Sequence, residues 1–440
     1  MTTANQNELM TRVGPGTAAG AAMRNYWQPA ALSEELSGVR PVAPVTLFGE
    51  KLVLFRDEQG RLGLLERECP HRGVDLCFGR REHGGLRCPF HGWLFDVTGQ
   101  CLEQPGEPTT SKAYLHLRHR AYPCVERNGI VFAYMGKGTP PPLPAFDCFT
   151  APETQTFAFK GLWKCNWLQA HEVGIDPVHP SFLHRMLADD ADDATYGRQF
   201  RDDTADTDVP LWKILRDYPR PTIRLEDTAY GFRLVTTRDL DGGLTHYRIT
   251  NMMFPNAIVI PMSNEMHITQ WHVPIDDVTC YWYSIFTSFG APVDRPTMRA
   301  QRLESLTLPL YQPKIGQREN WGFDSNDQVQ NTYVGVGMDV NAQDQWAVES
   351  PGPIRDRTKE HLGKSDVAIV KYRKLLMSAI DAVSKGTGAP FHLEADEAAN
   401  VRGPVAVDAI GSPAEQAECW QRRDRERRAA SSWARDEHAV

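Results

Sequence analysis

Two short motifs, each pairing a cysteine with a histidine, constrain the fold of this chain more than any other feature. The first reads CPHRG at residues 69–73 and the second reads CPFHGW at residues 88–93. The proline and glycine in each motif are typical of tight loops, and short runs of β-type sequence lie around them. Two such loops side by side would present two thiolates and two imidazoles to one site. The N-terminal part of the chain is therefore predicted to be a β domain built around a metal centre.

The four ligand types fit one of two metal centres. Two thiolates suit one iron of a [2Fe–2S] cluster, and two imidazoles suit the other iron. The alternative is a single tetrahedral zinc ion, which takes the same residue types. Zinc fingers group their histidines at one end, whereas here one histidine follows each cysteine, so the cluster is favoured. The predicted ligands are Cys69, His71, Cys88 and His91.

A second motif follows the proline-rich stretch 138–144, which indicates a boundary between domains. It has the form D-x-x-H-x₄-H, with Asp176, His179 and His184. Two imidazoles and one carboxylate are the ligands of mononuclear iron(II) oxygenases, which keep the opposite positions for O₂ and substrate. Histidines five residues apart diverge on a regular α-helix, but the two prolines inside the motif forbid one here. Taken alone, the motif could also represent ordinary histidines on a helix surface.

With both motifs present, the chain resembles the Rieske non-haem iron oxygenases, and within them the phthalate-dioxygenase-like group. The likeness covers residues 25–382 and includes YWQPAALSEEL, CPHRG, CPFHGWLFDVTGQC, NWLQA, DPVHPSFLH and QDQWAVESPGPIRDRTKEHLG. One departure is Val173, where many members have asparagine. The respiratory type of Rieske protein is excluded, because the positions of its two additional cysteines hold Val74 and Phe90.

The resemblance implies an α+β protein: an N-terminal antiparallel β Rieske domain, then a catalytic domain with an antiparallel sheet flanked by helices, of the helix-grip or START-like type. We expect a helical lead-in over 1–40 packed on the catalytic domain, the Rieske domain over 41–145, the catalytic domain over 146–385 and a C-terminal tail over 386–440. The tail is low in aliphatic residues and is expected to be peripheral. Eight aspartates in residues 189–208 predict a solvated loop.

The resemblance also supplies a third iron ligand and a role for Asp176. In this group the third iron ligand is an aspartate that follows a glutamine, and the Gln-Asp pair of this chain lies at residues 343–344. Asp344 is therefore the predicted ligand, and Asp339 is the alternative. Asp176 is expected to bridge a cluster histidine, His91, of a neighbouring subunit and the iron histidine His179. A carboxylate in that position orients both imidazoles. This arrangement implies a homotrimer or a stacked hexamer in which electrons cross between subunits.

The resemblance further implies the oxygenase component of a multicomponent system, which uses O₂ to hydroxylate or dihydroxylate a small aromatic compound. An aromatic carboxylate is favoured as substrate, with Arg248 and Arg185 as candidates for binding it. The alternatives are an O-demethylase of a methoxylated aromatic acid and, from another class, a Rieske electron-transfer protein. The expected cofactors are a Rieske [2Fe–2S] cluster and one mononuclear Fe(II).

Composition and charge limit the partners and the location. A net charge of −8 without a long basic run argues against nucleic acid or an anionic membrane as partner. No apolar run reaches the roughly 18 residues that span a bilayer, and the opening stretch MTTANQNELMTR lacks the apolar core of a signal peptide. We expect a cytoplasmic protein whose nine cysteines are thiols or metal ligands. No G-x-G-x-x-G fingerprint is present, so an NAD(P)H-dependent reductase with FMN and a plant-type [2Fe–2S] centre is the expected electron donor.

Overall fold

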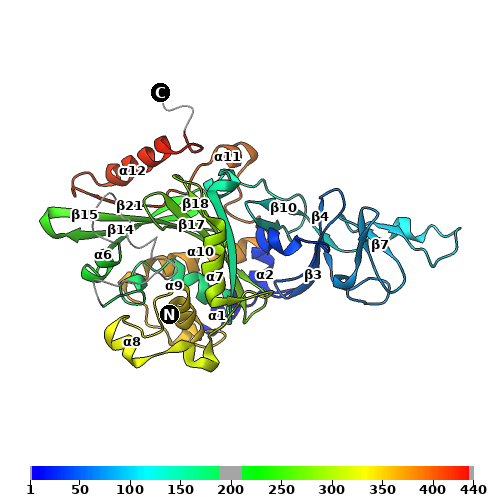
Figure 1. Cartoon of the computed structure of the whole chain (residues 1–440), viewed down its shortest axis with the longest axis horizontal. Coiled ribbons are helices and arrows are strands. Elements are labelled where there is room, and N and C mark those ends of the chain that lie inside the picture. Colours follow the sequence, from blue (N-terminus) through cyan, green and yellow to red (C-terminus); the bar gives the residue numbers. More distant parts are fainter. Residues whose placement is uncertain (1, 188–210, 436–440) are drawn as a thin grey trace.

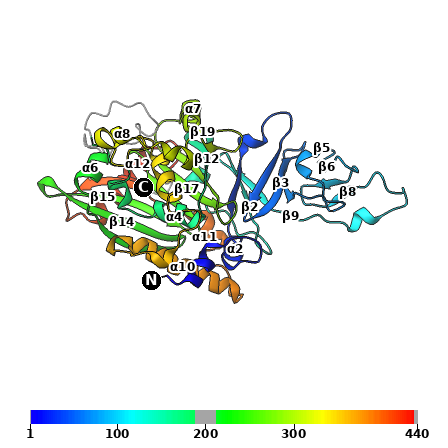
Figure 2. The same ribbon diagram turned by 90° about the horizontal axis from the view of Figure 1, so that it is seen from below.

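The computed structural model describes residues 2–187 and 211–435, so the predicted acidic loop lies outside the described residues. The molecule is elongated, with a slender β domain at one end of a larger α+β body (Figure 1). The view from below gives the same arrangement along the long axis (Figure 2). Within these residues, no helix is both long enough and apolar enough to cross a lipid bilayer. The expected fold class and the order of its two parts are confirmed.

The slender domain consists of small antiparallel sheets joined by tight turns. Its first sheet has the strand order β2 (Val42–Leu47), β3 (Glu50–Arg56), β4 (Leu62–Glu66) and β9 (Ala121–Tyr122). Its second has the order β5 (Arg80–Glu82), β6 (Gly85–Arg87), β7 (Leu94–Asp96) and β8 (Cys101–Glu103). Between β2 and β3, Phe48 and Gly49 both have positive φ, which suits the twist of a two-residue hairpin. The two sheets confirm the expected antiparallel β domain.

A large antiparallel sheet forms the centre of the second body. Its strand order is β12 (Thr156–Trp163), β18 (Cys280–Ser288), β17 (Met266–Pro274), β16 (Ala257–Pro261), β15 (Leu244–Met253), β14 (Gly231–Leu240) and β13 (Thr222–Thr228), and β21 (Val407–Gly411) also pairs with β15. Successive side chains on a strand point to opposite faces. The sheet therefore has two distinct faces, and one of them carries the site described below.

Helices cover the site face of this sheet. The elements on or near it are α4 (Trp167–Gly174), α6 (Leu211–Asp217), α7 (Arg295–Ser305), α9 (Val340–Glu349) and α10 (Val367–Ser384), with α8 (Ser325–Gln330) further out. Where α4 ends, a Cβ on Gly174 would lie 2.4 Å from Ile258 Cδ1 on β16. Glycine therefore lets the helix end approach the sheet closely, immediately before the predicted iron motif.

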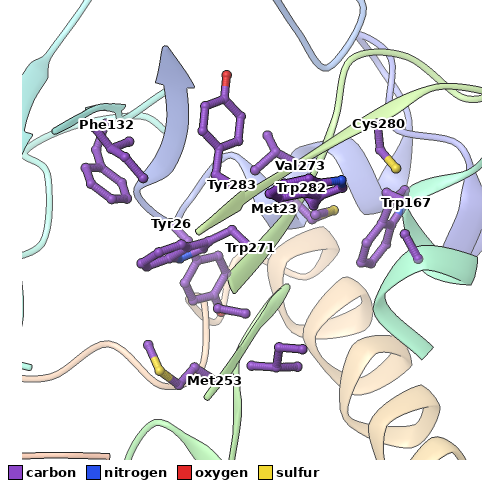
Figure 3. Close-up of a cluster of buried hydrophobic side chains, with 14 of the residues drawn as sticks. Met23, Tyr26, Phe132, Trp167, Met253, Trp271, Val273, Cys280, Trp282 and Tyr283 are labelled. Atoms are coloured by element: carbon purple, nitrogen blue, oxygen red, sulfur yellow. The ribbon is translucent and has the colours of Figure 1, made fainter. Parts of the chain in front are cut away.

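The hydrophobic core extends over both faces of the sheet and joins the two bodies. One part of it lies on the face opposite the site. A three-stranded sheet of β1 (Gln28–Leu32), β11 (Ile130–Ala133) and β10 (Cys124–Arg127) packs there. Phe132 meets Trp271 edge to face with 5.5 Å between ring centroids, and the Tyr283 hydroxyl donates to the Ala30 carbonyl at 3.0 Å. Figure 3 shows Phe132, Trp271 and Tyr283 in this cluster. A hinge motion between the two bodies would break this packing and is therefore unfavourable.

The first two helices pack against α10. They are α1 (Ala4–Thr11) and α2 (Ala18–Met23), and each begins with a threonine whose side chain caps it. α2 has the sequence AAGAAM, and its small side chains permit a close approach to α10. A Cβ on Gly20 would lie only 2.2 Å from the Val13 carbonyl oxygen. The start of the chain is thus held on the catalytic body.

The C-terminal segment, expected to be a peripheral tail, is instead part of the catalytic body. After α11 (Ala395–Asn400), β21 extends the sheet and α12 (Ala417–Ala430) covers the face opposite the site. Cys419 and Trp420 of α12 are buried against Val235, Tyr247 and Ile249. No apolar stripe was visible in the sequence of α12, because buried ion pairs make much of its contact.

The ion pairs of α12 give a stability prediction. Arg428 donates to Asp147 at 2.6 and 3.1 Å and to Asp424 at 2.8 Å, and all three side chains are at most 10% exposed. Burial raises the pKa of Asp147, and Arg428 offsets part of that rise. Arg428→Met should lower the free energy of unfolding by about 3–5 kcal/mol, because it leaves a buried carboxylate uncompensated. Urea titration measures the change in the free energy of unfolding. Arg425→Met, at an exposed position of the same helix, is the control and should change this free energy little. Equal losses of stability in the two variants would contradict the burial argument.

Candidate active site

The two Cys-His motifs form two loops with the same hydrogen-bond pattern. The main-chain N–H of Cys69 donates to the Val74 carbonyl at 2.9 Å, and that of Cys88 donates to the Trp93 carbonyl at 2.8 Å. The glycine before each acceptor has positive φ and donates back to the carbonyl of the cysteine. A chain with this geometry turns sharply and leaves the side chains of the loop free to converge.

The side chains of the two loops meet as a cysteine pair and a histidine pair. The rings of His71 and His91 lie 4.5 Å apart, and Trp93 stacks on His71 at 4.3 Å with an interplanar angle of 8°. Both cysteines are buried, with exposures of 3% and 2%. Burial, with a contribution from the adjacent Cys88 thiol, raises the pKa of Cys69 to about 11. A metal at this position would stabilise the thiolate form.

The spacing of these four ligands distinguishes a cluster from a zinc ion. Zinc bond lengths of about 2.0–2.3 Å require all ligand atoms to lie within roughly 4 Å of one another. In the described part of the chain, the only group of three or more ligand atoms within 4.8 Å is His179, His184 and Asp344. The cysteine pair and the histidine pair therefore stand apart, as ligands of two different irons must. The loops fit a [2Fe–2S] cluster and do not fit a single zinc ion.

The second motif begins where α4 ends. The chain leaves the helix after Gly174 and forms only a short 3₁₀ turn, His179–Ser181, before His184. The prediction that no regular helix spans this motif is confirmed. The tightened turn brings the rings of His179 and His184 to 5.1 Å, at an angle of 79°.

Helix α9 places a carboxylate against these two histidines. Asp344 Oδ1 lies 3.8 Å from His179 Nε2 and 3.4 Å from His184 Nε2. Asp339, the alternative in the sequence, is the N-cap of α9 and accepts from the Asn341 main-chain N–H at 2.9 Å. The structure therefore brings together His179, His184 and Asp344.

Hydrogen bonds on the far side of each ring orient both histidines. His179 Nδ1 donates to the main-chain carbonyl of Asp176 at 2.6 Å, and His184 Nδ1 donates to Gln343 Oε1 at 2.7 Å. The Gln343 amide is itself held by the Gly337 carbonyl at 2.7 Å. A proton on Nδ1 leaves the Nε2 lone pair directed at Asp344, as metal-binding histidines usually require.

The Asp344 carboxylate has the properties of a metal ligand. Its Oδ1 is buried and accepts no hydrogen bond from any residue in the described ranges. Burial, with repulsion from Asp339, raises the pKa of Asp344 to about 8. A divalent cation between the three donors would favour the ionised form. Two imidazoles and one carboxylate on one side of a site are the donor set of non-haem iron(II), so the residues fit that ion.

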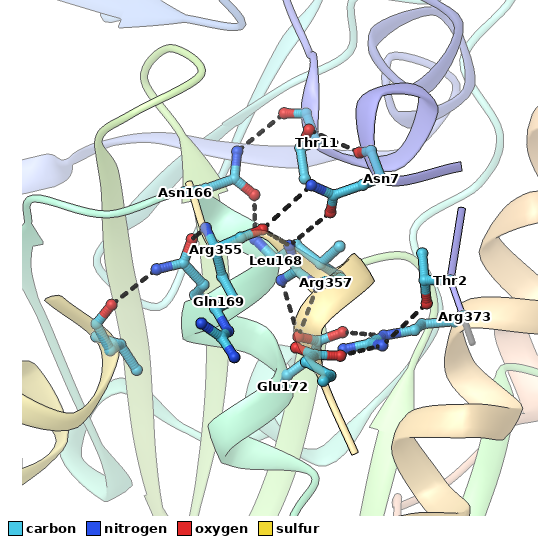
Figure 4. Close-up of polar contacts among 12 residues, drawn as sticks. Thr2, Asn7, Thr11, Asn166, Leu168, Gln169, Glu172, Arg355, Arg357 and Arg373 are labelled. Carbon is cyan, nitrogen blue, oxygen red and sulfur yellow. Dashed lines mark hydrogen bonds and ion pairs between the residues drawn. The ribbon is translucent and has the colours of Figure 1, made fainter. Parts of the chain in front are cut away.

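A buried ionic network supports the helix before the iron motif. Glu172 on α4 accepts from Arg357 at 2.8 Å and from Arg373 at 2.6 Å, and Figure 4 shows the N-terminal residues Thr2 and Asn7 around them. Burial alone would raise the pKa of Glu172, but the two arginines hold it below its usual range. This network joins α4, α10 and the N-terminal segment. Sequence reasoning did not identify this network.

The hydrogen bond from His184 to Gln343 makes a testable contribution to metal binding. Gln343→Leu removes the acceptor that fixes the ring, so the dissociation constant for Fe(II) should rise about 10- to 100-fold. Anaerobic iron titration of protein with an intact cluster measures the change. Gln330→Leu, at the exposed end of α8, is the matched control. An unchanged affinity in Gln343→Leu would show that the ring does not depend on this bond.

A cavity of about 190 Å³ opens onto the three donors. It lies between the site face of the sheet and the helices α6, α7 and α9, and most of its lining is apolar. The lining residues are Val173, Gly174, His179, Pro180, His184, Leu211, Trp212, Leu215, Arg248, Ile258, Ile260, Pro261, Met262, Ile268, Gln270, Trp282, Ser284, Phe286, Arg302, Val340, Asn341 and Asp344. A mostly apolar cavity with a few polar groups is the usual form of a small-molecule site.

The two arginines suggested by the sequence lie in different places. Arg248 lines the cavity, where it donates to Asp408 of β21 at 2.6 Å and to the Pro261 carbonyl at 3.1 Å. Arg185 lies outside the cavity lining, with its guanidinium 5.7 Å from the centre of the Tyr333 ring. Sequence reasoning missed Arg302 and Ser284, because nothing near them in the chain indicates that they face the cavity. It also could not foresee that the C-terminal segment supplies Asp408.

Two Cys-His loops and a separate two-histidine, one-carboxylate site beside a cavity define an iron-dependent oxygenase. A family profile described as Rieske [2Fe-2S] domain matches residues 26–121, and one described as LigXa C-terminal domain like matches residues 133–415. The chain belongs to the Rieske non-haem iron oxygenases, in the phthalate-dioxygenase-like group of oxygenase subunits. It is an enzyme whose cofactors are a Rieske [2Fe–2S] cluster and a mononuclear iron.

Similar proteins support this membership over most of the chain. The phthalate 4,5-dioxygenase oxygenase subunit of Pseudomonas putida is 33% identical, over 88% of this chain and 88% of its own length. The tert-butanol monooxygenase / tert-amyl alcohol desaturase oxygenase subunit of Aquincola tertiaricarbonis is 34% identical, over 85% of this chain and 76% of its own. The crystal structure of dicamba monooxygenase bound to dicamba aligns with a TM-score of 0.56 at 20% identity, covering 83% of this chain and 98% of that one. That structure supports the fold.

Proposed function

We propose that this enzyme oxidises a small aromatic carboxylate, using O₂ and electrons from a separate reductase. The observation that carries the proposal is the cavity, which opens directly onto His179, His184 and Asp344. Relatives named for phthalate and, at 32% identity, for 3-chlorobenzoate favour an aromatic acid. A relative named 5,5'-dehydrodivanillate O-demethylase, 31% identical, keeps O-demethylation of a methoxylated aromatic acid as the second candidate. A protein that only transfers electrons does not require a substrate-binding cavity beside a second metal site.

In this proposal each centre is held by its own set of residues. Cys69, Cys88, His71 and His91 hold the cluster, and His179, His184 and Asp344 hold the iron. When bound, the cluster supplies stored electrons and the iron supplies a site for O₂ activation. The protein orients the imidazoles through their Nδ1 atoms and keeps the apolar cavity largely free of water. Exclusion of water limits side reactions beside an oxidising centre.

Asp176 is proposed to connect the two kinds of centre across a subunit contact. Its carbonyl already accepts from His179 Nδ1, while its carboxylate Oδ1 accepts from the Val178 main-chain N–H at 2.8 Å. The second carboxylate oxygen can then accept from His91 of a neighbouring subunit. This differs in one respect from the sequence-based expectation, because the main chain of Asp176, and not its side chain, orients His179. The assembly would be a homotrimer or a stacked hexamer.

The electron donor is proposed to be an NAD(P)H-dependent reductase that carries FMN and a plant-type [2Fe–2S] centre. The relatives are oxygenase subunits of multicomponent systems, and a carbazole 1,9a-dioxygenase oxygenase, similar in fold with a TM-score of 0.50, has been solved in complex with its ferredoxin. A reductase that uses NAD(P)H works where that nucleotide is kept reduced, so we infer a cytoplasmic location.

Oxygen uptake with defined compounds tests the proposed function. The protein, a phthalate-type reductase and NADH would be supplied with phthalate, 3-chlorobenzoate, vanillate or tert-butanol. We expect uptake to rise with at least one aromatic acid, to require Fe(II) and to be absent in His184→Ala. Formaldehyde and the demethylated phenol from vanillate, without any product from phthalate or 3-chlorobenzoate, would favour the O-demethylase. A response to tert-butanol alone would contradict an aromatic substrate, and uptake by His184→Ala would contradict the assigned iron site.

A further inference from the structure

Two polar side chains lie among the isoleucines on the sheet side of the cavity. Ile258, Ile260 and Ile268 line the cavity from β16 and β17, and Gln270 and Ser284 line it from β17 and β18. Gln270 and Ser284 are directly opposite each other in the antiparallel strand pair, which places their Cβ atoms about 4.5–5.5 Å apart on the same face. We call these two residues the floor pair.

The hydroxyl of Ser284 has no hydrogen-bond partner within the described residues. The side chain is fully buried, and its Oγ neither donates to nor accepts from any residue that the structure describes. A serine hydroxyl has one donor and two acceptor positions, and buried polar groups in folded proteins are nearly always hydrogen-bonded. Because Ser284 lines the cavity, a molecule bound there is the partner that this hydroxyl lacks.

Gln270 presents its amide oxygen to the same part of the cavity. Its Nε2 donates to His272 Nε2 at 3.0 Å. Burial, with repulsion from His171, lowers the pKa of His272 well below its usual range, so the ring is neutral and can accept this bond. The bond turns the amide nitrogen toward His272 and leaves Gln270 Oε1 as an acceptor. Gln270 is only partly buried, so this oxygen is within reach of a ligand.

The two arginines of the cavity lining contact other protein groups. Arg248 on β15 is paired with Asp408 at 2.6 Å. Arg302 on α7 donates through Nη1 to the Asn341 amide at 2.8 Å, with the oxygen of that amide turned toward the guanidinium. The floor pair combines a hydroxyl donor with an amide acceptor. This combination complements a ligand group that both accepts and donates.

We propose that Gln270 and Ser284 form a subsite for a hydroxyl group of the substrate, which makes the substrate a hydroxylated aromatic compound. This proposal rests on the proposed oxidation of an aromatic acid and names the substrate class more closely. The substrate hydroxyl donates to Gln270 Oε1 and accepts from the Ser284 O–H. An ionised carboxylate and a methoxy oxygen can only accept, so either group would leave Gln270 Oε1 unpaired. Both residues of the floor pair are then specificity-determining residues.

Equilibrium binding of matched compounds tests the subsite without turnover. Calorimetric titration of anaerobic holoenzyme would compare 3- and 4-hydroxybenzoate with the corresponding fluorobenzoates, which keep the ring and the carboxylate but have no O–H. For at least one ring position, the wild type should bind the hydroxybenzoate about 10- to 100-fold more tightly, the range expected for two neutral hydrogen bonds. The methoxybenzoate of that position should bind no more tightly than the fluorobenzoate. Tighter binding of the methoxybenzoate than of the hydroxybenzoate would overturn the requirement for a donor.

Two serines of β18 separate recognition from folding. Ser284→Ala should abolish the preference for the hydroxybenzoate without lowering the thermal midpoint, because its hydroxyl bonds to no described residue in the free protein. Ser288→Ala is the matched control, since Ser288 Oγ lies outside the cavity and donates to the Ala291 carbonyl at 2.7 Å. It should lower the midpoint and keep the preference. Gln270→Leu should also abolish the preference while retaining the affinity for the fluorobenzoate. The opposite pattern in the two serine variants would identify Ser284 as structural and overturn its part in the proposal.

The failure of this proposal can be distinguished from the failure of the proposed function. Equal affinity of the wild type for the hydroxy and fluoro compounds, no binding of either hydroxybenzoate, or a preference that persists in Ser284→Ala and Gln270→Leu would each overturn the subsite. In any of these cases, iron-dependent oxygen uptake with phthalate or 3-chlorobenzoate would still support the proposed function. Absence of uptake with every aromatic acid, together with a preference that both variants abolish, would leave the subsite standing and contradict the proposed reaction.

Discussion

Replacing Asp344 by alanine is expected to remove the mononuclear iron and all turnover while leaving the cluster intact. Asp344 supplies the only carboxylate that approaches His179 and His184 in the described part of the chain, with Oδ1 3.8 and 3.4 Å from their Nε2 atoms. Two neutral imidazoles alone hold a divalent ion weakly, because nothing offsets the cost of bringing its charge into an apolar cavity. Iron analysis with the visible spectrum of the cluster measures both parts of the prediction.

Asp339→Ala is the matched control for that variant. Asp339 lies five residues earlier and caps α9, so its loss should cost about 0.5–2 kcal/mol of stability and leave the iron bound. If Asp339→Ala lost the iron and Asp344→Ala kept it, the third ligand would be misassigned. The class of metal site would survive that result, since both histidines would remain ligands.

Asp176→Asn is expected to keep both metal centres and to lower turnover by about 100- to 10,000-fold, in the range seen when an orienting aspartate beside a histidine becomes asparagine. The amide can still accept from Val178, and the main-chain carbonyl can still accept from His179, so the local fold should persist. What the amide cannot provide is a second acceptor oxygen for His91 of a neighbouring subunit. Rapid-mixing spectra should then show a cluster that the reductase reduces but that fails to reoxidise with substrate and O₂.

Asp356→Asn is a close control for this effect. Asp356 also accepts, at 3.1 Å, from the main-chain N–H two residues later, but it lies in an exposed turn. The cluster of Asp356→Asn should reoxidise at the rate of the wild-type cluster. Reoxidation at the normal rate in Asp176→Asn, or full activity from a monomeric species in sedimentation, would show that electrons do not cross between subunits through this carboxylate.

The features that the sequence predicted are those encoded by neighbouring residues. The cluster loops could be identified because each cysteine lies within three residues of its histidine, and Pro177 and Pro180 correctly excluded a regular helix. The antiparallel β character of the N-terminal domain followed from its short β-type runs and from the family resemblance. Asp344 required resemblance to a family, because no spacing rule connects it to His184 over so long a separation.

The features that the sequence could not reveal depend on contacts between distant segments. Gln343 orients His184, and Asp408 pairs with Arg248, across separations of 159 and 160 residues. His171, five residues before Asp176, is fully buried and lies 4.5 Å from the Tyr372 ring. The C-terminal helix lacks an apolar stripe, because buried arginine–aspartate pairs replace one. Such contacts become visible only when the sheet and its covering helices are assembled.

Iron and acid-labile sulfide analysis of two variants tests most directly whether one chain holds two separate centres. The wild type should contain the two irons and two sulfides of a [2Fe–2S] cluster and one further iron. Cys88→Ala should lose the sulfide and the cluster spectrum but keep the single iron, and His184→Ala should lose the single iron but keep the cluster. A protein that contains zinc and no sulfide, or one in which either substitution removes all of the metal, would contradict two independent centres.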